Sequence, residues 1–477
     1  MDLHVRLDGR GDLSGQIYRQ VRTAILAGLL PAGRPLPPTR ELAGELGIAR
    51  NTVSMAYDRL VAEGFLTARS GVGTFVADGL AQDGPASGDG DQVALAPRPV
   101  WAGLPEAADL SAPDPEFDFR PGIPDASLFP YAAWRRLTLR QLRSTAVGAG
   151  AHIPAAGYAP LRAAIARHVA VARGVPASGD DIIVTSGSQQ AVDLVARVLL
   201  APGDVVAVED PGYPLPRKLL TSSGYTVVPV PVDDEGLVVE ALPDAARLVY
   251  VSPSHQFPLG SSMSLGRRLT LLDWARRTGA LIVEDDYDSE FRFAGRPFEP
   301  LAGLSPGMGA GGHVAYVGSF SKTLLPTLRL GFVVAPRSLR DAMHKAKQLL
   351  DWHTAVPAQA ALAELIDEGL FARHLRGMRR VYARRHHLVT SLLGRDFAGL
   401  LDPVPSLVGM HVTALLTDRA ADDVALAGRA RAAGVEVLPL SPLAVAHPVQ
   451  GLALGYGAIA EDRIAPGLAR LRDALRS

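Results

Sequence analysis

The chain has 477 residues, 48% of them hydrophobic, with 48 basic and 49 acidic side chains and no cysteine. This size predicts two or three soluble globular domains, and the net charge of −1 excludes a polybasic nucleic-acid binder but leaves room for a small DNA-binding module. No apolar run reaches the roughly 20 residues that span a bilayer, residues 1–6 lack a signal-peptide pattern, and disulfides are excluded, so we expect a cytoplasmic protein.

Composition divides the chain into three predicted regions. Residues 1–77 hold nine arginines against seven acidic side chains and show short helical patterns. Residues 78–118 hold nine acidic side chains and one arginine, are rich in Gly, Pro and Ala, and show no periodicity, so we expect a flexible linker. From 119 to 477, apolar strand-like runs alternate with amphipathic helical patterns, which predicts an α/β domain with a mainly parallel sheet.

Three helices are predicted in the first region. Apolar residues share one helical face over 17–25. Thr39 is predicted to N-cap a second helix over 40–46, which Gly47 terminates. A third helix begins near Arg50 and repeats apolar residues at helical spacing.

A β-wing is predicted after the third helix. Strand-like segments 65–69 and 74–76 flank the Gly-rich turn 70–73. Three helices followed by a wing predict a winged helix-turn-helix. Residues 14–76 resemble the GntR-type DNA-binding domain, through motifs that include Arg40-Glu-Leu-Ala43, Arg50-Asn-Thr-Val53, Glu63-Gly-Phe-Leu66 and Gly73-Thr-Phe-Val76.

The GntR resemblance implies contacts to double-stranded operator DNA. In that family the arginine that opens the second helix and polar residues that begin the recognition helix touch DNA. Arginine can bind phosphate or guanine bidentately, and Thr and Ser can reach backbone oxygens. Taken alone, Arg40 and Arg50 could equally be solvated surface charges. The resemblance implies DNA contacts at Arg40, Arg50, Asn51, Thr52, Ser54, Ser70 and Gly71.

A phosphate site is predicted after the first strand of the third region. The buried strand 182–184 is followed by the Gly turn 185–189 and by helical spacing of apolar residues from Val192. Free N–H groups and the helix dipole meet at such a helix start and favour an anion. The alternative is a purely structural turn, because such connections are common.

A second strand, 281–283, ends in four carboxylates, Glu284, Asp285, Asp286 and Asp288. The carboxyl ends of strands are where α/β sheets place their ligands. Clustered carboxylates repel one another unless a cation or a protonated ring is present. A metal site and a solvated loop are the alternatives, but we expect no histidine nearby to complete a set of metal ligands.

Lysine is scarce, with only four lysines among the 48 basic residues. Lys322 follows the strand 314–317 and the motif Ser319-Phe-Ser321, and Arg329 comes seven residues later. Lysine, unlike arginine, can lose its proton and attack a carbonyl. A lysine for a Schiff base, an aspartate for a pyridine nitrogen, and serine with arginine for a phosphate together indicate pyridoxal 5′-phosphate (PLP).

Residues 119–475 resemble the fold-type I aminotransferases, and the resemblance assigns a role to each matching position. Lys322 is the Schiff-base lysine, Asp285 the partner of the pyridine nitrogen, and Tyr287 the hydroxyl beside the phenolic oxygen. Tyr213 would stack on the ring. The resemblance further implies phosphate contacts at Ser188, Gln189, Ser319 and Arg329, and a contact with the phenolic oxygen at His255 or Gln256, which replace the usual Asn-Pro-Thr-Gly loop.

A GntR-type head joined to an aminotransferase-like body resembles the MocR/PdxR regulators. Ser254-His-Gln-Phe-Pro258, Glu284-Asp-Asp-Tyr-Asp-Ser-Glu-Phe-Arg292 and Gly318-Ser-Phe-Ser-Lys-Thr-Leu-Leu-Pro326 look typical of that family. One departure from aminotransferases concerns the C-terminal strand, where the arginine that holds a substrate carboxylate has no counterpart in 451–456. Its loss argues against efficient transamination of amino acids, because hydrogen bonds to charged groups are worth about 1.5–3 kcal/mol each.

The leading hypothesis is therefore a PLP-binding transcriptional regulator that senses PLP, or an amine or amino acid that reacts with it, and that controls vitamin B6 synthesis or amine catabolism. The resemblance implies a homodimer in which each head packs on the partner's body, and a linker of about 40 residues is long enough for this exchange. A working aminotransferase with an appended head is the alternative, and a metal-dependent binding protein is the third.

Other residues receive simpler interpretations. Lys345 and Lys347 are predicted to lie on a solvated helix face, and Lys218 on the surface or at the crevice. Arg217 is a weaker prediction for contact with an effector carboxylate. His411 could be a packed core histidine or a ligand.

Overall fold

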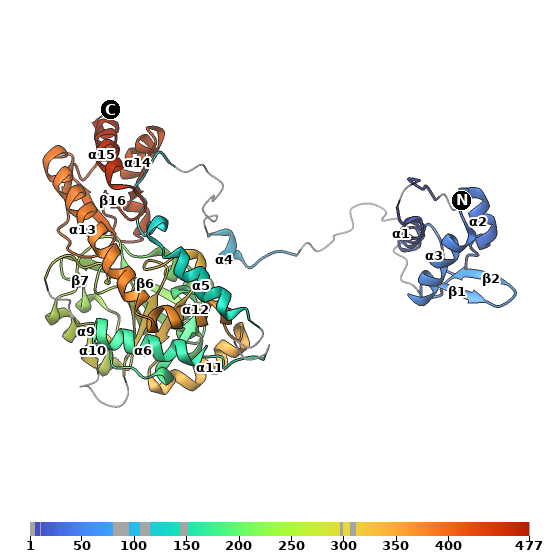
Figure 1. Cartoon of the computed structure of the whole chain (residues 1–477), viewed down its shortest axis with the longest axis horizontal. Coiled ribbons are helices and arrows are strands. Elements are labelled where there is room, and N and C mark those ends of the chain that lie inside the picture. Colours follow the sequence, from blue (N-terminus) through green and yellow to red (C-terminus); the bar gives the residue numbers. More distant parts are fainter. Residues whose placement is uncertain are drawn as a thin grey trace. The chain divides into compact units, whose positions relative to one another are not determined.

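The computed structural model describes residues 5–9, 11–79, 95–104, 115–143, 151–295, 299–305 and 312–476. The chain divides into two compact units, Met1–Arg98 and Pro99–Ser477, called here the head and the body (Figure 1). Within these ranges, none of the helices combines the length and the apolar character needed to cross a bilayer. Residues 80–94 and 105–114 of the predicted linker lie outside the described residues.

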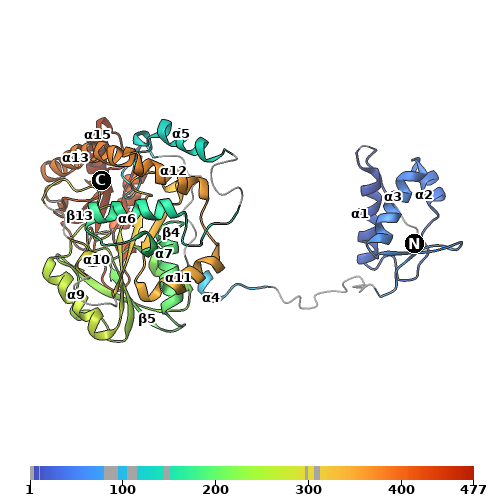
Figure 2. The ribbon, with the colours of Figure 1, turned by 60° about the horizontal axis from the view of Figure 1, so that its bottom comes forward.

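The head is a three-helix unit with a two-stranded wing, as Figure 2 shows. Its core is formed by the apolar faces of the helices, including Ile17, Val53 and Leu60, all fully buried. Leu66 pairs with Val76 in the antiparallel wing. The elements are α1 (Leu13–Leu26), α2 (Thr39–Leu46), α3 (Arg50–Ala62), β1 (Leu66–Arg69) and β2 (Gly73–Val76).

The start of α2 differs from the prediction. Thr39 is the first helical residue, and the extended Pro38 occupies the N-cap position without a side-chain bond. Proline fixes its own φ in an extended conformation suited to this position. Thr39 Oγ1 instead accepts a hydrogen bond of 3.2 Å from Arg50 Nε, which ties α2 to α3. Gly47 ends α2 in the left-handed conformation, as predicted.

The body is built around a mixed eight-stranded sheet in which β8, β9, β10, β5 and β6 run parallel and β11 and β7 are antiparallel to their neighbours. In sheet order the strands are β4 (Ile182–Thr185), β11 (Gly331–Val334), β10 (Val314–Ser319), β9 (Leu281–Asp286), β8 (Ala246–Val251), β5 (Val205–Asp210), β6 (Thr226–Asp233) and β7 (Gly236–Leu237).

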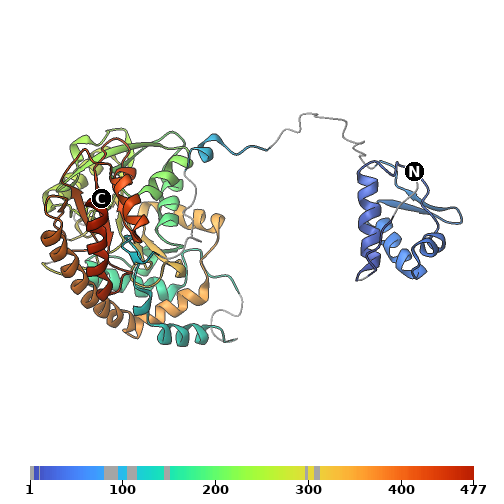
Figure 3. The same ribbon diagram turned by 90° about the horizontal axis from the view of Figure 1, so that it is seen from above.

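Helices cover both faces of this sheet (Figure 3). Because strand side chains alternate between faces, Val206 packs in a cluster with residues of α7 and α11, whereas Ala207 packs in another with residues of α9. The helices of this layer and its surroundings are α4 (Pro99–Ala102), α5 (Tyr131–Gln141), α6 (Ala159–Arg173), α7 (Ser188–Leu199), α8 (Pro214–Ser222), α9 (Leu265–Thr278), α10 (Leu301–Leu304), α11 (Arg337–Leu350) and α12 (Val356–Asp367).

A smaller C-terminal part adds an antiparallel sheet of order β12-β13-β16-β15, packed with three helices. Phe117 and Asp118, which fall in the predicted linker, form β3 and pair with Val435 and Glu436 of β14. This part comprises α13 (Leu370–Asp396), β12 (Leu401–Pro403), β13 (His411–Leu416), α14 (Asp423–Ala432), β14 (Val435–Glu436), β15 (Leu438–Pro439), β16 (Gly451–Gly455) and α15 (Glu461–Arg476).

Short 3₁₀ turns connect several of these elements, at Ala126–Leu128, Gly179–Asp181, Val239–Ala241, Pro326–Leu328 and Ser441–Leu443. The parallel strands place their carboxyl ends at one edge of the sheet, next to β13. The motifs that follow β4, β9 and β10 in the sequence therefore meet there.

Candidate functional site

A cavity of about 330 Å³ lies at this edge of the sheet. Its wall includes residues from the ends of three strands of the large sheet, β8, β9 and β10, from the start of α7 and from β13. Eight of the predicted cofactor-site residues line it: Ser188, Gln189, Tyr213, Asp285, Tyr287, Ser319, Lys322 and Arg329. The sequence prediction did not include the other lining residues, Pro121, Gly122, Leu215, Tyr250, Ser252, Phe257, Asp288, Ser321, Pro326, Met410 and His411.

Lys322 reaches the cavity from the loop after β10. Its Nζ donates a hydrogen bond of 2.6 Å to the carbonyl of Gly122. Burial lowers the pKa of Lys322, and the charges of Asp288 and Asp285 oppose that shift. A Cβ at Gly122, where φ is +80°, would lie 2.7 Å from Nζ, so glycine leaves room for the amine. The lysine is therefore held beside the cavity with its basicity reduced, as a carbonyl-attacking amine requires.

Asp285, the residue before the end of β9, lines the cavity and presents one oxygen without a partner among the described residues. Its Oδ2 accepts from the hydroxyl of Tyr250, whereas Oδ1 is buried and makes no hydrogen bond to the described residues. Burial raises the pKa of Asp285 to about 6. A protonated ring nitrogen at Oδ1 would satisfy this oxygen and stabilise the carboxylate, which fits the pyridine of PLP.

The phosphate end of the site is formed at the start of α7. Gly187 precedes this helix at φ +92°, and a Cβ there would lie 2.9 Å from Arg329 Nη2. Arg329, itself in the left-handed region, donates a hydrogen bond of 2.6 Å to the carbonyl of Ser186. The guanidinium thus lies against the N-terminal turn of α7, where the backbone N–H groups of Ser188 and Gln189 have no helical acceptor. These groups and this cation fit a phosphate.

The other carboxylates after β9 do not converge with Asp285. Glu284 accepts from the backbone N–H groups of Leu301 and Ala302, both at 2.9 Å. Asp286 is paired at 2.7 Å with the buried Arg173. Because successive strand residues point to opposite faces, the four-carboxylate metal site considered from the sequence does not form.

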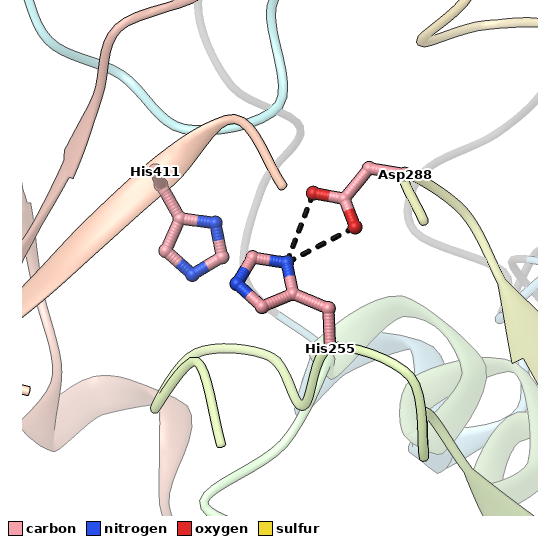
Figure 4. Close-up of side chains that lie close together, drawn as sticks. All are labelled: His255, Asp288 and His411. Carbon is pink, nitrogen blue, oxygen red and sulfur yellow. Dashed lines mark hydrogen bonds and ion pairs between the residues drawn. The ribbon is translucent and has the colours of Figure 1, made fainter. Parts of the chain in front are cut away.

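Asp288 instead lies close to two histidines, His255 and His411, and is hydrogen-bonded to the first (Figure 4). His255 Nδ1 lies 3.0 Å from both oxygens of Asp288 and 3.1 Å from the hydroxyl of Tyr287. The ring of His411 lies 4.5 Å from that of His255. The expectation that no histidine is near the carboxylates was wrong, because the fold brings β13 and the loop after β8 to the end of β9. Hydrogen bonds already account for both Asp288 oxygens without an ion.

His255 and Gln256 do not line the cavity. His255 contacts Tyr287, which does. The amide of Gln256 donates to the carbonyls of Pro211 and Phe257, and its oxygen accepts from the N–H of Leu259. Gln256 therefore stabilises the loop beside the cavity.

The structure also places the other lysines and Arg217, for which simpler interpretations were given. Lys347 is fully buried, so its placement on a solvated helix face was wrong, whereas Lys345 is exposed as expected. Arg217 and Lys218 are half-buried on α8, and neither lines the cavity.

The predicted DNA-contacting residues lie on the surface of the head. Arg40 is the second residue of α2, and Arg50 opens α3. Met55 on α3 is 58% exposed and was not predicted. An apolar side chain so exposed on this helix could contact a thymine methyl group. Arg40, Arg50, Asn51, Ser70 and Gly71 are exposed, and Thr52 and Ser54 are half-buried.

Comparison with known families divides the chain in the same way. Residues 13–76 match the family described as bacterial regulatory proteins, gntR family. Residues 128–451 match the family described as aminotransferase class I and II.

Among solved structures, the α-aminoadipate aminotransferase LysN of Thermus thermophilus, complexed with N-(5′-phosphopyridoxyl)-L-leucine, is 32% identical with a TM-score of 0.69. It covers 75% of this chain and 91% of its own. The kynurenine aminotransferase of Pyrococcus horikoshii is 29% identical over 75% of this chain and 90% of its own, also with a TM-score of 0.69. With the fit of the cavity, this similarity establishes PLP as the cofactor of the body.

Two relatives match nearly the whole chain. The probable rhizopine catabolism regulatory protein MocR of Rhizobium meliloti is 40% identical over 96% of this chain and 93% of its own. The pyridoxine biosynthesis transcriptional regulator PdxR of Corynebacterium glutamicum is 32% identical over 96% of this chain and 95% of its own. The chain therefore belongs to the MocR/PdxR-type transcriptional regulators, in which a GntR-type DNA-binding head is joined to a PLP-binding body of the aminotransferase fold.

Proposed function

We propose that this regulator senses the chemical state of its PLP site, and that PLP, or an amine that reacts with it, changes the affinity of the heads for operator DNA. The observation that carries the proposal is Lys322, an amine whose pKa is lowered by burial and whose Nζ lies at the wall of the cavity, 2.6 Å from the carbonyl of Gly122. An incoming amine can displace such a lysine from its bond to the cofactor, and the loop that carries the lysine can then change its conformation. A ligand shifts the equilibrium between two conformations of a protein only through a difference in its affinity for them. A covalent bond at Lys322 would provide such a difference.

Each predicted residue would have a separate task at the cofactor. Lys322 would attach the cofactor, and Asp285 would hold the proton of its ring nitrogen. Tyr213, whose pKa burial raises to about 12, would remain a neutral ring that packs on the face of the pyridine. Tyr287 would bind the phenolic oxygen, with His255 behind it. The phosphate would be bound by Ser188, Gln189, Ser319 and Arg329.

PLP supplies an aldehyde that bonds reversibly to amines and a ring that withdraws electrons. The chain contributes orientation and a dry environment for that reactivity. Turnover of amino acids needs a further cation for the substrate carboxylate. Among the described lining residues the cations are Lys322 and Arg329, both assigned to the cofactor. We therefore favour sensing over the alternative of a working aminotransferase with an appended head.

We further propose a homodimer in which each head packs on the partner's body, acting in the cytoplasm on paired operator half-sites. The domain limits 1–77, 78–118 and 119–477 belong to this proposal. Regulation of vitamin B6 synthesis would need PLP alone, whereas regulation of amine catabolism would need an amine as well.

Sequencing of the DNA that the full-length protein retains, with and without PLP, tests this function. We expect a set of sites whose recovery changes with PLP. Sites beside genes for vitamin B6 synthesis would support regulation of that synthesis by PLP alone. Recovery that is identical with and without PLP, and also with added amines, would contradict sensing.

A further inference from the structure

Eleven residues of the cavity wall remain after those assigned to the cofactor are set aside, and they are called here the unassigned wall. Leu215 lies on the first turn of α8, Phe257 on the loop after β8, and Met410 directly before β13. The hydroxyls of Tyr250 and Ser252 already donate to Asp285 and Glu209. The apolar members are Pro121, Leu215, Phe257, Pro326 and Met410, and the others are Gly122, Tyr250, Ser252, Asp288, Ser321 and His411.

Among the polar residues of the unassigned wall, Asp288 and His411 act as hydrogen-bond acceptors. Asp288 accepts from His255 Nδ1 and from the N–H of Met410 at 3.1 Å, yet a carboxylate has about four lone-pair sites and can accept more. His411 Nε2 lies 3.2 Å from the carbonyl of Pro258. A carbonyl can only accept, so Nε2 carries the proton and Nδ1 is left as an acceptor. Burial also lowers the pKa of His411, which keeps its ring neutral.

The described residues of the unassigned wall contribute no positive charge that could receive an anion. Among the described lining residues, Lys322 and Arg329 are the cations, and the proposed function assigns both to the cofactor. A carboxylate placed here would lose its water beside the carboxylate of Asp288 and apolar walls, and burial of an unpaired charge is strongly unfavourable. A hydroxyl group in the same place would donate to Asp288 or His411.

Resting on the sensing function proposed above, we infer that the effector is a primary amine without a carboxylate, with a hydroxyl group near the amine that donates to Asp288 or His411. The amino-alcohol class has these features. In the exchange, the effector nitrogen bonds to the aldehyde carbon of the cofactor as the bond from that carbon to Lys322 Nζ breaks. Two protons pass from the effector nitrogen to Nζ, so Lys322 ends as a free amine and neither water nor an oxidant is consumed.

Matched pairs of amines test this inference on the full-length, PLP-loaded protein. Phenylalaninol and phenylalanine differ in a hydroxymethyl group against a carboxylate, and ethanolamine and glycine differ in the same way. The change in visible absorbance gives the half-saturating concentration of each, and the same titration of free PLP corrects for intrinsic reactivity. After this correction we expect the half-saturating concentration of each amino alcohol to be at least about tenfold lower than that of its matched amino acid. This is the scale of one hydrogen bond to a charged group.

Substitutions at two positions, Leu215 and His411, separate the charge effect from the hydroxyl effect. Leu215 is 39% exposed, so Leu215→Arg can add a cation to the wall without burying it. We expect this variant to bind amino acids more tightly and to lose most of the preference for amino alcohols over amino acids. Leu215→Gln, which adds no charge, should keep that preference. His411→Phe retains a ring but removes the acceptor, and should lower the preference for phenylalaninol over phenethylamine.

The outcomes distinguish this inference from the sensing function. Amino acids that exchange as readily as amino alcohols after correction would overturn the inference. Failure of every amine to exchange, while PLP alone changes DNA binding, would overturn the inference and leave sensing in place. Preferential exchange of amino alcohols with no effect of PLP or amines on DNA binding would support the inference and overturn sensing.

Discussion

The ammonium group of Lys347, fully buried on α11, is paired with the carboxylate of Asp351 one helical turn later. Asp351 Oδ2 also accepts a hydrogen bond of 2.8 Å from the amide of Gln190, whose own oxygen accepts from the N–H of Ser186 at 2.9 Å. Arg329 binds the carbonyl of the same Ser186. The proposed phosphate site is thus connected through side chains to the end of α11.

We expect Lys347→Met to weaken PLP binding and to lower the free energy of unfolding by about 1–3 kcal/mol, because it leaves a partly buried carboxylate without its cation. PLP affinity can be measured by fluorescence and stability by denaturant titration. Lys345→Met is the matched control on the exposed face of the same helix, and should change stability by about 0.5 kcal/mol or less. Equal effects of the two substitutions would show that the Lys347–Asp351 pair does not support the site.

Tyr250→Phe removes the hydroxyl that donates to Asp285. That hydrogen bond opposes the effect of burial on the pKa of Asp285, so its loss should raise this pKa further and favour the neutral acid. A neutral Asp285 binds a protonated ring nitrogen less well, and we expect PLP affinity to fall about tenfold, as for one hydrogen bond to a charged group. The loss should be larger at pH 6 than at pH 8, because at the higher pH Asp285 is ionised in either protein. A loss that does not depend on pH would contradict this assignment.

Glu209 gives the apoprotein a pH-dependent stability. Burial raises its pKa to about 7, although Ser252 Oγ donates to it at 2.7 Å. An acid whose pKa is raised by folding holds its proton in the folded state while the unfolded chain has already lost it, so stability falls as pH rises from about 4.5 to about 7. Relative to Glu209→Gln, the wild-type apoprotein should lose about 3 kcal/mol over this window. Denaturant titrations of both proteins at pH 5 and pH 8 measure the difference, and a constant difference would contradict the raised pKa.

Arg40→Ala should weaken DNA binding and flatten its dependence on salt. If Arg40 contacts one phosphate, the slope of log K against log salt should decrease by about 0.9. Arg197→Ala removes an equally exposed arginine from the body, where it pairs with Asp193, and should leave the slope unchanged. Anisotropy titrations at several salt concentrations make the comparison, and equal slopes for all three proteins would exclude a phosphate contact at Arg40.

Local sequence patterns predicted the elements of the head and eight of the residues that line the cavity. The helices follow from apolar spacing and the wing from its glycines. Asp285 lies near the end of an apolar strand and Lys322 shortly after one, and parallel strands bring such positions to one edge of a sheet. The N-cap of α2 was misassigned because Thr39 suits a cap by residue type, whereas Pro38 takes that place through its fixed backbone.

Contacts between distant segments could not be predicted in this way. His255, Asp288 and His411 come from three separate elements, and no local pattern joins them. Lys347 was assigned to a solvated face because its neighbours in the sequence are polar, but α11 packs against α7 and buries it. Tyr250 is an ordinary aromatic residue of a buried strand until the register places it beside Asp285 on β9. Each case depends on tertiary packing.

The most direct test of the account is the affinity of the full-length protein for a DNA site recovered with it, measured by anisotropy at constant salt, with and without PLP. For the wild type we predict that PLP changes the dissociation constant by about fivefold or more, in the usual range of coupling between two sites. For Lys322→Ala we predict no comparable change and no visible absorbance from attached cofactor. Equal affinity of the apo and PLP-loaded wild type, together with indifference to amines, would contradict the proposal that Lys322 connects cofactor chemistry to DNA binding.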